Sequence, residues 1–172
     1  YKATKFAIEQ GHTNVAIISS PSHTSASSER INGYLNALEE YRIPRNRKYV
    51  RVVGVEPDSG YAITKEMLQL DNPPTALFVA SNYPLLSSLN ALRELDVKVP
   101  GELSLICFDD PEWGPFLNPP LTAIRPATNE LCNQAVTHLF DRINGIYNGS
   151  ARSVAIPTEL IIRSSVSLLK KK

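Results

Sequence analysis

The chain has 172 residues, of which 42% are apolar and 20% are charged, and its formal net charge is +1. This composition is typical of a globular chain that buries a real hydrophobic core, in one domain or in one lobe with part of another. A net charge so close to zero argues against a partner that is held by bulk electrostatics. No apolar run approaches the roughly 20 residues of a membrane span. The two cysteines, Cys107 and Cys132, lack the spacing of a metal site and are expected to be buried free thiols.

As far as about residue 110, the chain alternates helical and extended patterns. Apolar residues recur at the spacing of a helix face in segments 3–10, 28 to before 44, 57–71 and 84–95, and Ser28 is expected to cap the second of these helices. Short runs of apolar or β-branched residues predict strands at residues 15–18, 49–55, 75–80 and 103–108. Four such alternations indicate right-handed βαβ units and a parallel sheet that is covered on both faces. We therefore predict a doubly wound, three-layer α/β/α lobe of the flavodoxin-like kind.

The pattern changes after Pro120. A short strand is expected at residues 121–125, followed by a long helix that Asn129 caps and that ends at about Ile143. Two further strands are predicted at residues 154–156 and 160–163, separated by Pro157, and the lysine-rich tail is expected to fray.

Polar side chains follow the predicted strands at the point where each one ends, which is where open parallel sheets bind ligands. Strand 103–108 stops at Asp109 and Asp110, strand 75–80 stops at Ser81 and Asn82, and Arg30 opens the helix that follows the first strand. A guanidinium offers five donors in a fixed fork, which suits vicinal hydroxyls or a carboxylate. Taken alone, Arg30 is better interpreted as a solvated residue in the first turn of a helix.

The two aspartates allow several interpretations. A carboxylate at a strand end can accept hydrogen bonds from sugar hydroxyls, ligate Mg²⁺ or take a phosphoryl group, but the last two roles need further acids at neighbouring strand ends. The neighbouring strands end in serine and asparagine, so metal or phosphoryl chemistry is not expected. Asp110 could instead cap the turn at Pro111, and Asp109 could bind only backbone amides.

Nothing in the sequence looks catalytic. No histidine has a nucleophile or metal partner at a recognisable spacing, and no nucleotide-binding or hydrolase motif is present. The basic residues between positions 42 and 51 lack interleaved stacking residues except two tyrosines, so a solvated face is favoured over a nucleic-acid surface. We expect no enzyme activity, no catalytic residue, no metal and no cofactor.

Taken together, these pieces resemble the effector-binding domain of the lactose/galactose repressor (LacI/GalR) family of bacterial transcription regulators. The similarity covers essentially the whole chain in the right order. The stretches that carry it are FAIEQGHTNVAII at residues 6–18, ERINGYLNALE at 29–39, DSGY at 58–61, PPTALFVA at 73–80, VPGELSLICFDD at 99–110, PPLT at 119–122 and IIRSS at 161–165.

The resemblance implies a two-lobed domain like that of periplasmic sugar-binding proteins. It places residues 1–121 in the C-terminal lobe, residues 122–157 in a crossover segment of a mostly absent N-terminal lobe, and residues 158–172 in a return strand and tail. It also implies an N-terminal helix-turn-helix headpiece, absent from this chain, that binds operator DNA. A small-molecule effector, a homodimer and a cytoplasmic location without membrane contact follow from the same family pattern.

The resemblance also assigns roles to single residues. Arg30 matches the sugar-contacting arginine of the family and Asp109 its ligand-binding aspartate, and Thr24 falls at a polar effector contact. Ser81 and Asn82 replace an Asn-Asp pair, and Val55 replaces an aromatic residue that stacks on the effector in many members. Trp113 is expected at the edge of the cleft. The dimer interface is expected to include Leu85, Leu86, Leu89 and Phe116.

Two other functions remain open from the residues. A periplasmic sugar-binding protein would have the same lobes but would work as a monomer with a transporter. An enzyme on a flavodoxin-like fold would use Asp109 with Mg²⁺. The apolar helix 84–95 favours the dimeric regulator, in which a sugar or related metabolite shifts lobe closure and so changes the affinity for DNA.

Overall fold

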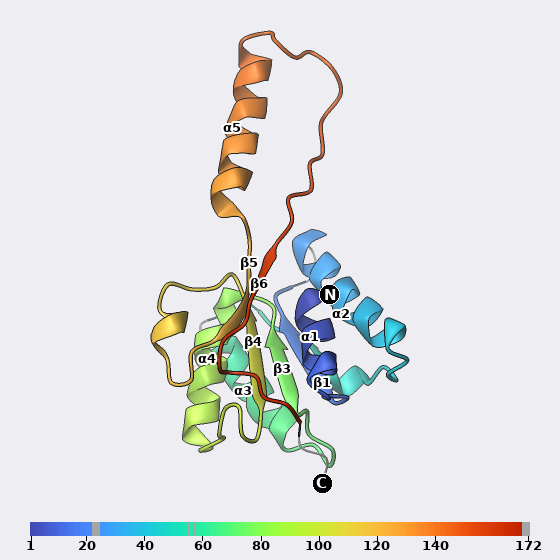
Figure 1. Cartoon of the computed structure of the whole chain (residues 1–172), viewed down its shortest axis with the longest axis vertical. Coiled ribbons are helices and arrows are strands. Elements are labelled where there is room, and N and C mark those ends of the chain that lie inside the picture. Colours follow the sequence, from blue (N-terminus) through green and yellow to red (C-terminus); the bar gives the residue numbers. More distant parts are fainter. Residues whose placement is uncertain (22–24, 55, 57, 170–172) are drawn as a thin grey trace. The chain divides into compact units, whose positions relative to one another are not determined.

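The computed structural model describes residues 1–21, 25–54, 56 and 58–169, and its strands form one sheet in the order β2-β1-β3-β4-β5-β6 (Figure 1). The strands are β1 (Val15–Ser19), β2 (Val50–Val52), β3 (Ala76–Val79), β4 (Ser104–Phe108), β5 (Thr122–Arg125) and β6 (Glu159–Ile161). The four pairs that link β2, β1, β3, β4 and β5 are all parallel. This arrangement confirms the predicted α/β fold class.

Helices connect the strands. They are α1 (Lys2–Glu9), α2 (Ser25–Glu40), α3 (Ser59–Leu68), α4 (Asn82–Glu94) and α5 (Thr128–Ile143), with short 3-10 helices η1 (Arg47–Tyr49) and η2 (Gly114–Phe116). No helix in the described ranges combines the length and the apolar character that a membrane crossing requires.

The sheet is buried on both faces because its strands are apolar at nearly every position. Alternate side chains of a strand point to opposite faces, so Ile17 packs with α1 and α2 whereas Ile18 packs with α3 and α4. Figure 1 shows these two helix pairs on opposite sides of the sheet. The carboxyl ends of β1, β3 and β4 therefore share one edge, where the polar residues follow.

Several predicted boundaries are wrong. Helix α2 begins at Ser25, so Ser28 lies inside its first turn rather than at its cap. Strand β2 ends at Val52, and the predicted strand 154–156 does not form, since residues 151–158 adopt no regular element. A strand needs a neighbour for its backbone hydrogen bonds, and no described strand pairs with this segment.

The chain divides into two compact units, one comprising Tyr1–Ile124 with Leu160–Lys172 and the other Arg125–Glu159. The first unit contains strands β1 to β4 and helices α1 to α4. The second consists mainly of α5, in which no residue is buried. The assignment of residues 122–157 to a second lobe remains a prediction.

The C-terminal segment is held as far as Leu169, which contradicts the expected fraying of Leu168 and Leu169. The Leu169 amide donates to the Gln10 carbonyl at 2.8 Å, and the Ser167 hydroxyl donates to the Pro100 carbonyl at 3.1 Å. His12 joins this segment to the body of the unit: its Nε2 lies 3.1 Å from the Ser167 carbonyl and its Nδ1 lies 2.9 Å from Thr75 Oγ1. Because a carbonyl only accepts, Nε2 carries the proton and Nδ1 accepts from Thr75.

Burial of His12 makes stability depend on pH. Desolvation lowers the pKa of His12 below its ordinary value of 6.5, with the hydrogen bond to Ser167 as a smaller opposing effect. The folded state therefore binds fewer protons than the unfolded state just below pH 6.5, and stability is lost as the pH falls through that range. Each unit of depression contributes about 1.4 kcal/mol. We expect urea unfolding at pH 7.5 and pH 5.0 to show this loss, and the loss to shrink in His12→Gln. An unchanged pH dependence in His12→Gln, or an equal reduction in the control His138→Gln, would contradict this assignment.

Candidate functional site

Four of the predicted ligand residues gather at the carboxyl edge of the sheet. Ser81 and Asn82 follow β3, Asp109 follows β4, and Arg30 reaches the same edge from α2. They come from segments far apart in the sequence because parallel strands end at a common edge. Thr24, a further predicted ligand residue, and Val55, which replaces an aromatic residue of the family, lie outside the described residues.

The guanidinium of Arg30 is held in place by two neighbours. Its Nη1 donates to the Ala80 carbonyl at 2.8 Å, and its Cζ lies 3.7 Å from the centroid of the Phe108 ring. Stacking on an aromatic face and a hydrogen bond to the backbone fix the planar group in orientation. Burial lowers the pKa of Arg30, and the nearby charge of Asp109 opposes this effect. Arg30 is therefore a pre-positioned, half-buried donor rather than a solvated residue.

Asp109 lies in a turn that is rare for residues other than glycine. Its φ is +82° and that of Asp110 is +37°, both in the left-handed region, where aspartate is among the better tolerated side chains. The Asp109 amide donates to the Ile124 carbonyl at 2.9 Å, and its Oδ2 accepts from Asn82 Nδ2 at 3.2 Å. Burial raises the pKa of Asp109, whereas the charge of Arg30 lowers it. The carboxylate thus faces a donor on the neighbouring strand end and lies in the field of Arg30.

The hydroxyl groups of Ser20 and Ser81 complete the described part of this edge. Ser20 Oγ donates to Ser81 Oγ at 2.5 Å, which joins the ends of β1 and β3. Ser81 is buried and sits at the N-cap of α4 without a side-chain capping bond. Together with Arg30, Asn82 and Asp109, these residues present both donors and acceptors, an arrangement that suits a ligand rich in hydroxyl groups.

Trp113 is half-buried and packs against the core beneath α3 and α4, whereas Phe108 and Arg30 belong to the opposite side of the sheet. Its place at the edge of a cleft remains a prediction.

The expected dimer residues separate into two groups. Leu85 is 0% exposed and belongs to the core, so the prediction that it contributes to a surface patch is wrong. Leu89 is half-buried against the same core, whereas Leu86 is 61% exposed and Phe116 is 87% exposed. The helical period explains the difference: residues 85 and 86 are about 100° apart around α4, and the face that carries Leu85 points toward the sheet.

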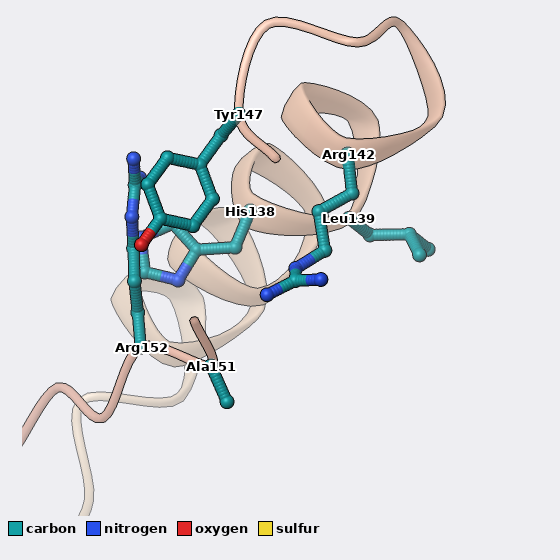
Figure 2. Close-up of a pocket in the computed structure, with 6 residues that line it drawn as sticks. All are labelled: His138, Leu139, Arg142, Tyr147, Ala151 and Arg152. Carbon is teal, nitrogen blue, oxygen red and sulfur yellow. The ribbon is translucent and has the colours of Figure 1, made fainter. Parts of the chain in front are cut away.

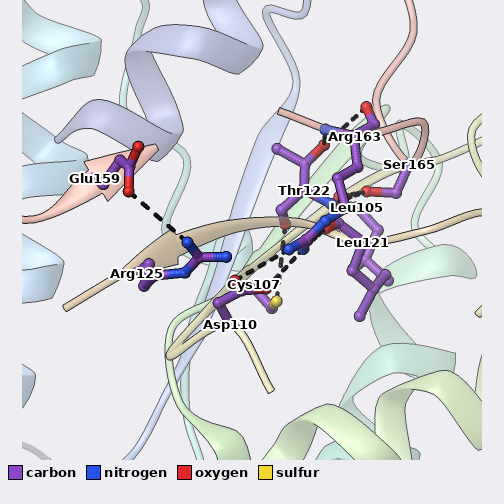
Figure 3. Close-up of polar contacts among 9 residues, drawn as sticks. All are labelled: Leu105, Cys107, Asp110, Leu121, Thr122, Arg125, Glu159, Arg163 and Ser165. Atoms are coloured by element: carbon purple, nitrogen blue, oxygen red, sulfur yellow. Dashed lines mark hydrogen bonds and ion pairs between the residues drawn. The ribbon is translucent and has the colours of Figure 1, made fainter. Parts of the chain in front are cut away.

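The sequence did not predict the ion pair between Arg163 and Asp110, the residue that follows Asp109. Arg163 Nη1 lies 2.6 Å from Asp110 Oδ1 and its Nη2 lies 3.1 Å from Asp110 Oδ2, so the pair is bidentate (Figure 3). Asp110 therefore binds a guanidinium, a role that the sequence did not predict. The only signal in the sequence was a single charge, Arg163, at the end of an apolar run.

Cys107 lies beside this pair. Burial raises the pKa of its thiol to about 12, with a further increase from Asp110 and an opposing effect of Arg163. Both cysteines are free, as the sequence predicts, and the predicted burial is confirmed for Cys107 but wrong for Cys132, which is exposed.

A profile of the periplasmic binding protein-like domain matches residues 4–166. The chain belongs to this domain family. Among curated relatives, the HTH-type transcriptional repressor PurR of Pasteurella multocida is 33% identical over 166 residues, which are 96% of this chain and 49% of the repressor. The chain spans about half the length of the curated relatives it matches.

Solved structures agree with this assignment to the periplasmic binding protein-like family. A sugar-binding transcriptional regulator of the LacI family from Escherichia coli, complexed with phosphate, has a TM-score of 0.85 at 25% identity and covers 97% of this chain and 59% of its own. The transcriptional regulator CelR in complex with cellobiose has a TM-score of 0.87 at 30% identity, with coverages of 94% and 49%. The predicted resemblance to the C-terminal part of LacI-type effector-binding domains is thereby confirmed.

The second unit of this periplasmic binding protein-like chain contains a shallow pocket of its own. Figure 2 shows the residues that line it, namely His138, Leu139 and Arg142 of α5 and Tyr147, Ala151 and Arg152 of the following loop. Arg152 stacks on the Tyr147 ring with its Cζ 3.6 Å from the centroid, and Arg142 donates to the Gly149 carbonyl at 2.9 Å. Both guanidinium groups already have partners in the loop, so these contacts hold the loop against α5 and offer no open site.

Proposed function

We propose that this chain is the ligand-sensing part of a LacI-type transcriptional regulator. A small molecule rich in hydroxyl groups, most simply a sugar, binds at the carboxyl edge of the sheet between two lobes. Binding shifts the closure of the lobes and so changes the affinity of the protein for operator DNA. The repressors and regulators among the relatives support this role, and they do not favour a periplasmic protein that serves a transporter.

One observation carries the proposal. Arg30 and Asp109 are opposite charges, both half-buried at the same strand edge, and neither forms a closed ion pair with the other. Arg30 instead binds a backbone carbonyl and a ring, and Asp109 binds the amide of Asn82. Two charged groups that are held in place in this way retain donors and acceptors for a neutral polar ligand, and hydrogen bonds to charged groups are the stronger ones.

A thermal-shift screen of the full-length protein against sugars, nucleosides and sugar phosphates tests the ligand class. Cellobiose belongs in the panel because a related regulator was solved with it. A ligand at 100 times its Kd stabilises the folded state by about 2.7 kcal/mol, which is a measurable rise in Tm. Addition of Mg²⁺ alone is the control for the alternative that Asp109 supports metal-dependent chemistry, and a rise in Tm with Mg²⁺ that Asp109→Ala abolishes would favour that alternative.

We also propose that the protein is a homodimer whose interface includes Leu86, Leu89 and Phe116. The support is that Leu86 and Phe116 are large apolar side chains that stand exposed on one unit. Replacing Leu86 by aspartate is expected to shift the dimer toward monomer in analytical ultracentrifugation, because a charge buried in an apolar interface costs several kcal/mol. The matched control is Asn36→Asp, which adds the same charge at an exposed position of α2, on the opposite face of the sheet. An unchanged sedimentation coefficient in Leu86→Asp would remove α4 from the interface.

The second unit, in this proposal, belongs to the other lobe. Helix α5 carries exposed apolar side chains at helical spacing, namely Leu131, Val136, Leu139, Phe140 and Ile143. An amphipathic helix normally buries such a face. A lobe that covers it would also supply the neighbouring strand that residues 154–156 lack.

A further inference from the structure

Arg163 joins three segments of the first unit at the place where the chain leaves that unit and returns to it. The chain leaves after Ile124 and returns at Leu160. The Arg163 guanidinium forms the bidentate pair with Asp110 after β4, and its Nη1 also donates to the carbonyl of Leu121, just before β5 (Figure 3). The Arg163 side chain therefore binds both the turn that contains Asp109 and Asp110 and the residue just before β5. Arg163 itself belongs to the segment that returns to the first unit.

The backbone of Arg163 is itself fixed. Its amide donates to Thr122 Oγ1 at 3.0 Å, and its carbonyl accepts from the same hydroxyl at 3.1 Å. Two residues later, Ser165 Oγ accepts from the Thr122 amide at 2.8 Å and donates to the Leu105 carbonyl at 2.6 Å. Side-chain hydrogen bonds thus tie the returning segment to β4 and β5, so the guanidinium projects from a rigid base.

The turn that Arg163 holds is strained. Asp109 and Asp110 are consecutive left-handed residues without glycine, a conformation that persists only where the surroundings enforce it. The Asp110 side chain is 4% exposed and that of Arg163 is 15% exposed, so solvent cannot replace the pair easily. A buried ion pair is weak evidence for stability by itself, and its usual contribution is a specific geometry.

From these contacts we infer that the Asp110–Arg163 pair is a positioning element that holds Asp109 in its ligand-binding orientation and couples it to the two inter-unit connections. The inference rests on the proposed function, since it gives Asp109 the role of effector acceptor. A change in the path of the chain at residue 124 reaches the Asp109 turn directly, through the Asp109 amide, whereas a change at residue 160 reaches it through Thr122 and Arg163. Neither Asp110 nor Arg163 needs to touch the effector.

Hydrogen exchange measures the positioning role without any effector. The Asp109 amide, which donates to Ile124, reports on the turn, and the Ala80 amide, which donates to the Ile18 carbonyl at 2.7 Å, reports on the end of the neighbouring strand β3. In Arg163→Gln and in the double variant with Asp110→Asn, exchange at Asp109 is expected to be at least roughly 10-fold faster relative to exchange at Ala80. The double variant leaves no unpaired buried charge and guards against simple misfolding.

The chain contains a matched control for this experiment. Arg125 and Glu159 also form an ion pair of arginine and a carboxylate, at 3.9 Å on the same two connections, but both side chains are largely exposed (Figure 3). Arg125→Gln is expected to leave exchange at Asp109 unchanged. Equal acceleration at Asp109 and Ala80 in the Arg163 variants, no acceleration at all, or the same effect in Arg125→Gln would each overturn the inference.

A second measurement separates positioning from a purely structural role. Burial raises the pKa of Asp109 in the native turn, so a relaxed turn is expected to lower that pKa toward its ordinary value in the double variant, as followed by carbon NMR of the carboxyl group. An unchanged pKa would overturn the positioning role. Neither measurement uses an effector. A failed ligand screen would therefore count against the proposed function without affecting the interpretation of the hydrogen exchange and NMR results.

Discussion

Replacing Arg30 by alanine is expected to weaken effector binding by roughly 10- to 100-fold, the equivalent of one or two charge-assisted hydrogen bonds. The guanidinium is already oriented by the Phe108 ring and the Ala80 carbonyl, so a ligand that binds it loses little side-chain entropy. Removing it also leaves Asp109 without the neighbouring positive charge that lowers its pKa. Isothermal titration of the full-length protein, with the panel compound that raises its Tm most, measures the loss.

The control for Arg30→Ala is Arg93→Ala, which removes an exposed guanidinium from the last turn of α4. Affinity is expected to be unchanged in the control, and the dimer is expected to persist in both variants. Wild-type affinity in Arg30→Ala would remove this residue from the site. If Arg30→Ala loses affinity because it unfolds, Asp109→Asn provides a second test of the site, because it keeps the size of the side chain and removes its charge.

Leu85→Ala is expected to lower the free energy of unfolding by about 2–5 kcal/mol, whereas Leu86→Ala is expected to change it by less than about 0.5 kcal/mol. The two leucines are neighbours on α4 with the same intrinsic helix propensity. Their exposed fractions, 0% and 61%, are the variable that differs. Urea unfolding of both variants, at a protein concentration low enough for the protein to be monomeric, measures the two values.

This pair of substitutions also tests the correction to the expected dimer surface. Equal destabilisation of the monomer in Leu85→Ala and Leu86→Ala would contradict the exposed position of Leu86 on α4. A small effect of Leu85→Ala would contradict its place in the core.

The sheet and its two layers were predictable because the strands are short, apolar and separated by clear turn signals. Val15 to Ile18 and Ala76 to Val79 read as buried strands without any knowledge of their neighbours. The meeting of Arg30 with Asp109 was predictable for a topological reason, since parallel strands and the helices that follow them bring their ends to one edge.

The predictions that were wrong or missing concern features that depend on packing between distant parts of the chain. Nothing local distinguishes Leu85 from Leu86, because the phase of α4 against the sheet depends on contacts with distant residues such as Gly60 of α3. The partner of Asp110 lies 53 residues away at Arg163, and no spacing rule connects them. Strand 154–156 had the right composition and no partner among the described strands. Propensity alone does not supply a hydrogen-bonded neighbour.

The most direct test of the central claim is a thermal-shift comparison of the wild-type full-length protein with Asp109→Asn across the panel of sugars, nucleosides and sugar phosphates. We expect at least one hydroxyl-rich compound to raise the Tm of the wild type by several degrees and to leave that of Asp109→Asn nearly unchanged. An equal rise in both proteins, or no rise with any compound, would contradict a ligand site built on Arg30 and Asp109.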